Sequence, residues 1–106
     1  MYIAWTTVED KATATALARQ AIERQLAVCV QIEGPVTSVF SWKGRIEENP
    51  EYRLTFKCLE SKLSALERSV LSQHPYETPE WIAVRADRIG EKYLSWAKAD
   101  PSTSPL

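Results

Sequence analysis

The chain has 106 residues, of which 44% are hydrophobic and 25% charged, which suits one globular domain of average composition. Its 13 Lys and Arg residues nearly balance its 14 Asp and Glu residues, and this argues against nucleic-acid binding, which usually needs a basic excess or stripe. The sequence shows neither a signal peptide nor an apolar run of the roughly 18 residues that span a bilayer. We therefore expect a cytoplasmic protein without membrane contact, whose two cysteines are free thiols.

The first quarter of the chain predicts a strand followed by a helix. Residues 2–6 form a short apolar and aromatic run that is typical of a buried strand. Thr7 resembles a helix N-cap, with Asp10 three residues later as a weak capping box. Alanines and leucines then recur at helical spacing, which predicts a helix over residues 9–25 with a small face that can lie close to a sheet.

The outgoing half of a long hairpin follows. Residues 27–32 and 36–42 are rich in β-branched and aromatic residues, which favours strands. Gly34-Pro35 lies between them and indicates a bulge or a bend. Lys43-Gly44 is a candidate two-residue turn.

The returning half is predicted to begin with residues 45–48, which run back along the hairpin. A break follows at Asn49-Pro50, and then a strand over residues 51–59 with alternating apolar residues. A turn at Lys43-Gly44 without any later shift would place Cys29 directly opposite Cys58 and bring the two thiols close. A shift of one or two residues at either interruption would separate them.

The last part of the chain predicts a helix, a strand and a short second helix. Ser61 can cap the first helix, and His74-Pro75 ends it, because the residue before proline avoids the α region. Residues 81–84 read as the last strand and residues 91–98 as a short helix. Residues 101–106 are expected to be a flexible tail.

The predicted order is β-α-β-β-α-β, which is the ferredoxin-like α+β pattern with one antiparallel sheet and both main helices on one face. Residues 1–100 would form a single domain. The hairpin from Ala27 to Leu59 is longer than so small a sheet needs. Because overhanging strands expose edges that pair with other chains, we expect an oligomer held by β-pairing between subunits.

Four segments together resemble one known family. They are residues 74–80 (HPYETPE), 27–30 (AVCV), 38–44 (SVFSWKG) and 93–96 (YLSW), and the combination is similar to the CutA family of divalent-cation tolerance proteins over residues 6–97. The resemblance implies a ferredoxin-like fold, a homotrimer with an architecture like that of PII signalling proteins, copper or another divalent metal ion as ligand, and no enzymatic activity. The chain departs from the family pattern at Gln31, at Trp81 and in the Trp5-Thr6-Thr7 segment, which lacks the cysteine of some members.

The resemblance makes Cys29, His74 and Glu77 candidate metal ligands, since thiolates and imidazoles bind soft and borderline metals well. No metal is required by the sequence, and Cu(II) is the first candidate. The structural alternative is that Cys29 is a small buried residue of a central strand and that His74 is favoured by the C-terminal end of a helix dipole. A lone histidine needs further ligands, from Glu80 or from a neighbouring subunit.

Two further sets of residues are assigned to surfaces. Tyr76, Lys57 and Glu80 are candidates for a ligand cleft, although Tyr76 can also pack on the preceding helix. Trp42 and Phe40, next to the hairpin turn, and Trp81 are candidates for the trimer interface, because a monomer would expose large aromatic side chains there.

Other functions on the same fold remain as alternatives. The first is a PII-like signalling or scaffold module that binds a small molecule or a protein partner in the subunit clefts, without a metal. A small hydrolase of the acylphosphatase type would need a phosphate-binding loop with an arginine, whereas residues 6–10 are acidic and contain neither glycine nor arginine. An RNA-binding domain would place Tyr52 and Phe56 on a basic face, but its glycine-rich signature is missing.

Overall fold

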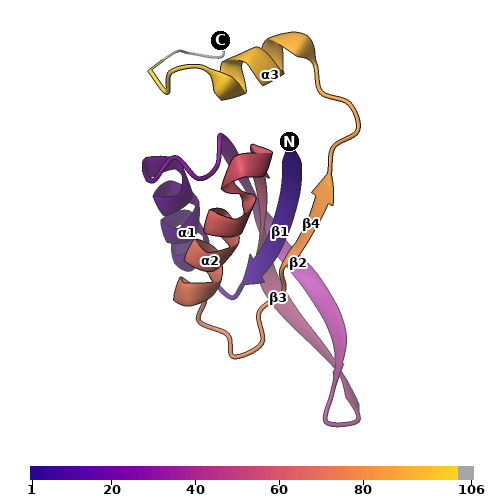
Figure 1. The fold of residues 1–106 in the computed structure, drawn as a ribbon. Coiled ribbons are helices and arrows are strands. Elements are labelled where there is room, and N and C mark those ends of the chain that lie inside the picture. The colour runs from indigo at the N-terminus through magenta and orange to yellow at the C-terminus, as the bar shows by residue number, and fades with distance from the viewer. Residues whose placement is uncertain (103–106) are drawn as a thin grey trace.

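The computed structural model describes residues 1–102 and arranges them in the predicted order (Figure 1). Part of the predicted tail, residues 103–106, lies outside the described residues. The elements are β1 (Tyr2–Val8), α1 (Lys11–Glu23), β2 (Cys29–Trp42), β3 (Arg45–Cys58), a 3-10 turn η1 (Glu60–Lys62), α2 (Leu63–Gln73), β4 (Ile82–Arg85) and α3 (Glu91–Lys98). The predicted α+β ferredoxin-like fold with a long hairpin and a short C-terminal helix is confirmed.

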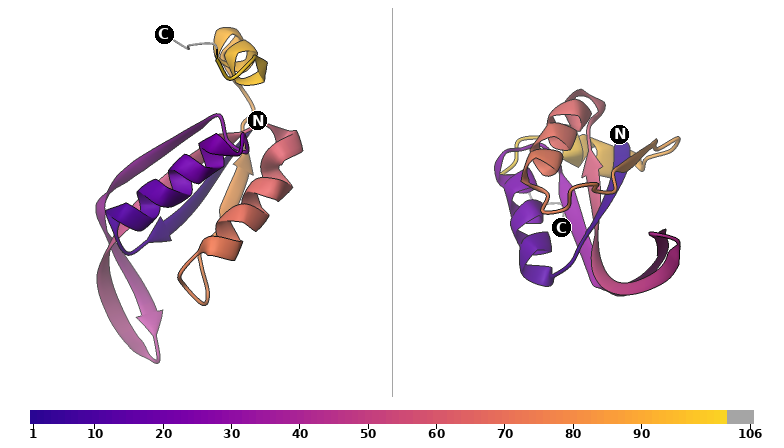
Figure 2. Two further views of the ribbon diagram at one scale, coloured as in Figure 1. Left: turned by 90° about the vertical axis from the view of Figure 1, so that its left-hand side faces the viewer. Right: turned by 90° about the horizontal axis from the view of Figure 1, so that it is seen from below.

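The sheet is antiparallel throughout, with the strand order β2-β3-β1-β4. Helices α1 and α2 lie side by side against one face, and α3 lies beyond the end of the sheet at which β1 begins (Figures 1 and 2). Among the described residues, the other face of the sheet carries no helix except α3 at this end (Figure 2). We call it the open face.

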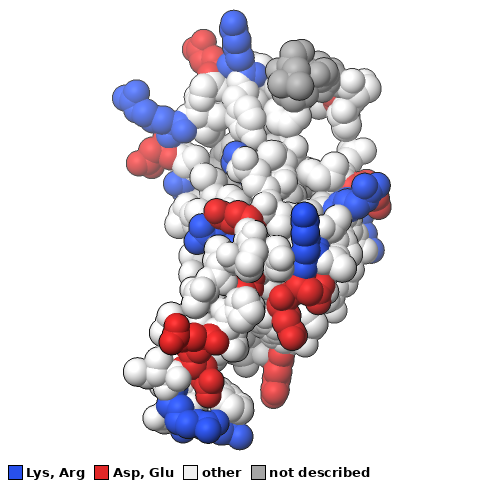
Figure 3. Space-filling view, turned by 180° about the vertical axis from the view of Figure 1, so that it is seen from behind, with Lys and Arg blue, Asp and Glu red and all other residues white. Residues whose placement is uncertain are grey.

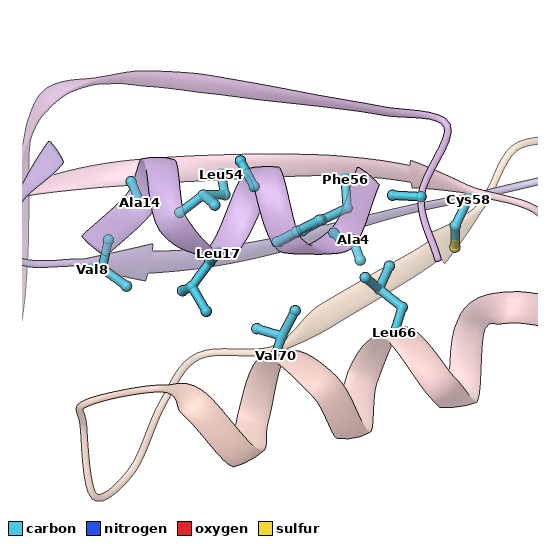
Figure 4. Packing of buried hydrophobic residues seen from close by; sticks show 12 residues of the cluster. Ala4, Val8, Ala14, Leu17, Leu54, Phe56, Cys58, Leu66 and Val70 are labelled. Carbon is cyan, nitrogen blue, oxygen red and sulfur yellow. The ribbon is translucent and has the colours of Figure 1, made fainter. Parts of the chain in front are cut away.

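A single core lies between the sheet and the two helices (Figure 4). Alternate residues of β1 and β3 point into it, as the period-2 geometry of a strand requires. The alanine-rich side of α1 and the Leu66 and Val70 side chains of α2 close it on the side opposite the sheet (Figure 4). Its largest fully buried side chains are Phe56, Leu54, Leu66 and Val8.

The hairpin turn and the bulge both lie where the sequence predicts them. Lys43 and Gly44 have φ angles of 51° and 74°, the positive values that a tight two-residue hairpin turn requires. The pairing register shifts between Glu33 and Val36. A Cβ on Gly34 would lie 2.6 Å from the Tyr52 ring and 3.0 Å from the Glu51 carbonyl oxygen, so the bulge needs glycine at this position.

Of the two alternatives for the cysteines, the structure shows the one in which they are separated, because the bulge shifts the register by one residue. Cys29 pairs with Lys57, and Cys58 pairs with Tyr2 of β1. Cys58 is fully buried in the core, whereas Cys29 shares the open face with Lys57. Both thiols are free, and they point to opposite faces of the sheet.

Beyond the bulge, residues 36–51 extend away from the rest of the molecule as a curved two-stranded arm (Figures 1 and 2). We call this segment the arm and the remainder the body. The molecule measures 47 × 27 × 25 Å, and its radius of gyration of 14.9 Å exceeds the roughly 13 Å of a compact domain of this length. The arm exposes four large apolar side chains, namely Val39, Phe40, Trp42 and Ile46.

Several predicted boundaries are corrected. Strand β1 continues to Val8, so Thr7 is not a helix cap; the side chain of Asp10 caps α1 instead, accepting a hydrogen bond of 2.7 Å from the Thr13 amide. The α2 helix has no side-chain cap, since η1 precedes it at Ser61.

Strand β3 runs through Asn49-Pro50 without a break. Proline is tolerated there because β1 pairs with β3 only from Tyr52 onward, which leaves this stretch on an edge.

Candidate functional site

His74 ends α2 and fastens the following loop to the end of β1. Its Nε2 atom lies 3.0 Å from the Thr7 carbonyl oxygen and 3.1 Å from the Thr6 hydroxyl oxygen. Its Nδ1 atom accepts a hydrogen bond of 3.1 Å from the Tyr76 amide. Both ring nitrogens are therefore engaged within the chain.

These partners determine the protonation of the ring. The Thr6 hydroxyl donates its proton to the Glu80 carbonyl oxygen at 2.7 Å, so its oxygen acts as an acceptor toward His74. The Tyr76 amide needs a lone pair on Nδ1, which leaves the proton on Nε2 and the imidazole neutral. Burial lowers the pKa of His74 below its ordinary value and favours the same neutral form.

Tyr76 carries this connection to the base of the arm. Its hydroxyl donates a hydrogen bond of 2.7 Å to Glu51, and its ring meets that of His74 edge-on at a centroid distance of 4.8 Å. Burial, and then the hydrogen bond to Glu51, raise the pKa of Tyr76 far above its usual range, so the hydroxyl remains a donor. We call His74, Tyr76 and Glu51 the latch, because together they join β1, the loop and the arm.

Cys29 lies in a different place, at the start of β2 on the open face. It is half-buried and pairs with Lys57 across the ladder. Burial, with the neighbouring Cys29 as the next cause, raises the pKa of Tyr93 from α3. The Lys57 amine lies 5.9 Å from the centroid of the Tyr93 ring. Cys29, Lys57 and Tyr93 therefore form one small cluster under α3.

The candidate metal ligands are not brought together within one chain. Cys29 pairs with Lys57, which is opposite Ile3, whereas His74 contacts Thr7, four residues further along β1. At about 3.4 Å per strand residue, these positions are roughly 14 Å apart along the strand direction alone. Glu77 is exposed on the loop. Within residues 1–102, no three His, Cys, Asp or Glu side chains gather closely enough to hold a metal ion.

The three candidate cleft residues also lie in different parts of the molecule. Tyr76 lines a cavity beside the arm, Lys57 belongs to the Cys29 cluster, and the side chain of Glu80 is exposed while its carbonyl oxygen accepts from Thr6. The cavity has a volume of about 800 Å³. Its lining consists of Phe40, Trp42, Pro50, Tyr76, Asn49 and the carboxylate residues Glu9, Asp10, Glu47 and Glu51.

Of the three candidate interface residues, Phe40 and Trp42 are exposed on the arm. Trp81 is half-buried and packs within its own chain, where the centroid of its ring lies 5.9 Å from that of the Phe56 ring. Four other exposed apolar side chains were not predicted from the sequence, namely Ile82, Val84, Val39 and Ile46. The first two alternate on β4 with the half-buried Ala83, so both faces of that strand are apolar, and only the structure shows which face is left uncovered.

No helix in the described part of the chain is long and apolar enough to cross a membrane.

Comparisons with known proteins identify relatives along nearly the whole chain. The family described as CutA1 divalent ion tolerance protein matches residues 2–100. A protein CutA homolog from Xenopus laevis is 40% identical over 93 residues, which cover 88% of this chain and 62% of that protein. The chain thus spans about three fifths of the length of this relative.

Two solved structures show the same fold. A CutA1 from the psychrotrophic bacterium Shewanella sp. SIB1, described as a stable protein, has a TM-score of 0.88 and 36% identity, covering 97% of this chain and 95% of that one. A divalent cation tolerance protein CutA from Archaeoglobus fulgidus, described as periplasmic, has a TM-score of 0.86 and 28% identity, covering 92% of this chain and 95% of that one.

Proposed function

The chain belongs to the CutA1 divalent ion tolerance protein family, and from this premise we propose that it acts as a homotrimer that binds divalent metal ions such as copper in the cellular response to metals. It would work by binding and not by catalysis. We place it in the cytoplasm, where its two free thiols match a reducing environment.

The exposed apolar surface supports assembly. Ile82 and Val84 of β4 are 53% and 44% exposed, and their pairing partners Trp5 and Ile3 continue the same apolar strip on the open face. The arm adds four more exposed apolar side chains, namely Val39, Phe40, Trp42 and Ile46. Contiguous apolar surface of this kind is typical of protein interfaces. Strands β2 and β4 are also the two edges of the sheet, so each can pair with a strand of another copy.

The positions of the candidate ligands favour a metal site that is shared between subunits. Cys29, His74 and Glu77 cannot meet on one ion within one chain, so a neighbouring copy would have to supply the missing ligands. Cys29 is the strongest candidate, as a half-buried thiol on the open face. His74 could bind a metal only after one ring nitrogen left its present partner, either the Thr7 carbonyl oxygen or the Tyr76 amide, so coordination by His74 would break a contact that fastens the loop.

Native mass spectrometry of the purified protein, titrated with Cu(II) and with Zn(II), tests both parts of this proposal. We expect a trimer that takes up metal ions in a fixed ratio to subunits and loses this uptake in Cys29→Ser. Cys58→Ser is the matched control, because it removes a thiol that is fully buried on the other face of the sheet. A trimer that binds no metal would overturn the metal assignment alone, and a monomer would overturn the assembly.

A further inference from the structure

A groove lies between α3 and the C-terminal end of α1, at the opposite end of the molecule from the arm (Figure 1). It has a volume of about 320 Å³, at the lower end of the range of roughly 300–1,000 Å³ that small-molecule sites occupy. Its charged lining residues are Lys62, Lys98 and Asp100, and most of the other lining residues are apolar. The groove thus combines an apolar floor with a net positive rim.

The groove lies outside the surfaces that we assign to assembly. It includes no residue of the arm or of β4, and none of the exposed side chains of the open face named above. Val28 marks its boundary with the open face. Side chains alternate along a strand and Cys29 belongs to the open face, so the preceding Val28 points to the side of the helices. The assembly proposed above therefore leaves the groove open.

The floor of the groove is apolar and fixed in place. Ile22 is 43% exposed, and among the described residues it is the one exposed large hydrophobic side chain that lies neither on the arm nor on β4. On the side of α3, the Trp96 ring packs against that of Tyr93 at a centroid distance of 5.5 Å. The Leu26 amide donates to the Ala21 carbonyl oxygen at 2.9 Å, which fixes the turn after α1. Such a floor favours a ligand with an apolar chain.

Two lysines line the groove without an ionic partner. Lys62 comes from η1, and Lys98 is the last residue of α3. Neither forms an ion pair with any residue in the described part of the chain. Asp100, the acidic residue of the lining, accepts a hydrogen bond of 2.8 Å from the Ser102 amide instead. This bond lowers the pKa of Asp100, so its carboxylate stays ionised and directed at its own turn.

The acidic residues beside the groove are engaged by arginines. Glu23, which follows Ile22, lies 3.7 Å from Arg19, and Glu60 of η1 lies 3.9 Å from Arg85. Figure 3 shows other Asp and Glu side chains gathered on the arm, at the far end of the molecule from α3. The two unpaired lysine amines therefore favour an anion at the rim of the groove.

We propose that this groove binds an amphiphilic carboxylate of medium chain length, whose carboxylate group pairs with Lys62 and Lys98. Its alkyl chain lies along the Ile22 and Trp96 side chains. The apolar floor distinguishes such a ligand from a small inorganic anion, and the two amines distinguish it from a neutral lipid. The proposal uses none of the candidate metal ligands, so it is independent of metal binding.

Isothermal titration of the assembled protein with octanoate, below its micelle-forming concentration and at physiological ionic strength, tests the proposal. We expect saturable binding with one site per chain. Lys62→Gln and Lys98→Gln should each weaken it about threefold, as the loss of one exposed ion pair does. Lys92→Gln, the same change on α3 but away from the groove, is the matched control and should leave the affinity unchanged.

The apolar chain supplies a second test. Heptanoate, which is one methylene shorter, should bind about fourfold more weakly than octanoate, because a buried methylene contributes a constant increment. Ile22→Gln changes an exposed position and should weaken octanoate binding by a similar factor. Octan-1-ol, which has the same chain without the charge, should bind more weakly than octanoate and should not distinguish Lys62→Gln from the native protein. Native mass spectra of each variant establish that assembly is intact.

Three results would overturn the proposal. Absence of saturable binding would mean that another part of the chain or a neighbouring copy fills the groove. Equal weakening by Lys62→Gln and Lys92→Gln would show a non-specific charge effect. Equal affinity for acetate and octanoate would show an anion site that does not use the apolar floor. The metal titration described above can succeed or fail whichever of these results is obtained.

Discussion

The body and the arm of this protein use the same kind of residue in opposite ways. In the body, Phe56 and Leu54 are completely buried between the sheet and the helices. In the arm, Ile46 is 80% exposed and Val39 is 62% exposed, although both lie in regular, fully paired strands. The body thus has its own hydrophobic core, while the arm has only the ladder between its two strands.

This contrast indicates what each region needs in order to be stable. An isolated two-stranded hairpin is marginally stable in water, so the order of the arm has to come from elsewhere. Within the chain, the bulge at Gly34 and the latch hold its base, and nothing among the described residues covers its outer half. We infer that the arm is an assembly element, and that the apolar side chains it exposes are covered by another copy.

The largest effect is expected from the core of the body. Phe56→Ala should lower the free energy of unfolding by about 3–5 kcal/mol, since it removes a fully buried aromatic side chain and leaves a cavity. Phe40→Ala is the matched change on the arm and should leave the secondary structure of the subunit intact while weakening assembly. Guanidinium denaturation followed by circular dichroism measures the unfolding free energy of Phe56→Ala, and sedimentation measures the assembly of Phe40→Ala. Equal loss of subunit structure in both variants would contradict the contrast between body and arm.

The junction between the two regions is the next most sensitive place. Gly34→Ala would put a Cβ 2.6 Å from the Tyr52 ring and should cost about 1–3 kcal/mol of stability, as overpacked sites do. Gly90→Ala serves as the control, because a Cβ there meets nothing within 4 Å. Thermal unfolding of the two variants measures the difference. A Gly34→Ala protein as stable as the control would mean that the junction is freely deformable.

The latch should contribute a smaller amount. Tyr76→Phe removes the hydrogen bond to Glu51 and should lower stability by about 1 kcal/mol. Amide hydrogen exchange should rise in the arm and stay unchanged in α1. Tyr2→Phe removes a hydroxyl from the edge of the core and provides the comparison. Unchanged exchange in the arm of Tyr76→Phe would show that the latch does not hold the arm.

A fall in pH should weaken the latch through protonation of His74. The pKa of His74 in the folded protein lies below its ordinary value of 6.5, so the unfolded chain takes up a proton first as the pH falls. The stability contributed by His74 is therefore complete above about pH 6.5 and decreases as the pH falls below it. Unfolding measured between pH 5 and 7.5 should show this slope, and His74→Gln should flatten it. If the stability of His74→Gln falls with pH as steeply as that of the native protein, other titrating groups cause the dependence.

The sequence predicted the body well because its signals are local or periodic. Strand alternation in residues 51–58, the helical spacing of alanines in α1 and the stop at His74-Pro75 all correspond to observed features. The cap of α1 was misplaced from Asp10 to Thr7, since both residue types cap helices and only the length of β1 decides between them.

The candidate site was predicted less well because it depends on register and long-range contacts. The bulge at Gly34-Pro35 was predicted, but not the size of its shift, and one residue was enough to move Cys58 away from Cys29. The importance of the HPYETPE segment was recognised through resemblance, yet its hydrogen bonds to Thr6, Thr7 and Glu51 join residues far apart in sequence. No spacing rule places such contacts.

Sedimentation velocity of the native protein and of the double variant Val39→Ser/Ile46→Ser tests whether the exposed side chains of the arm hold the subunits together. Both side chains are exposed in the chain, so their replacement should leave the fold of the body unchanged, as circular dichroism would verify. We expect a native trimer and a folded double variant that dissociates at concentrations where the native protein does not. A native monomer, or a double variant that assembles as tightly as the native chain, would contradict this expectation.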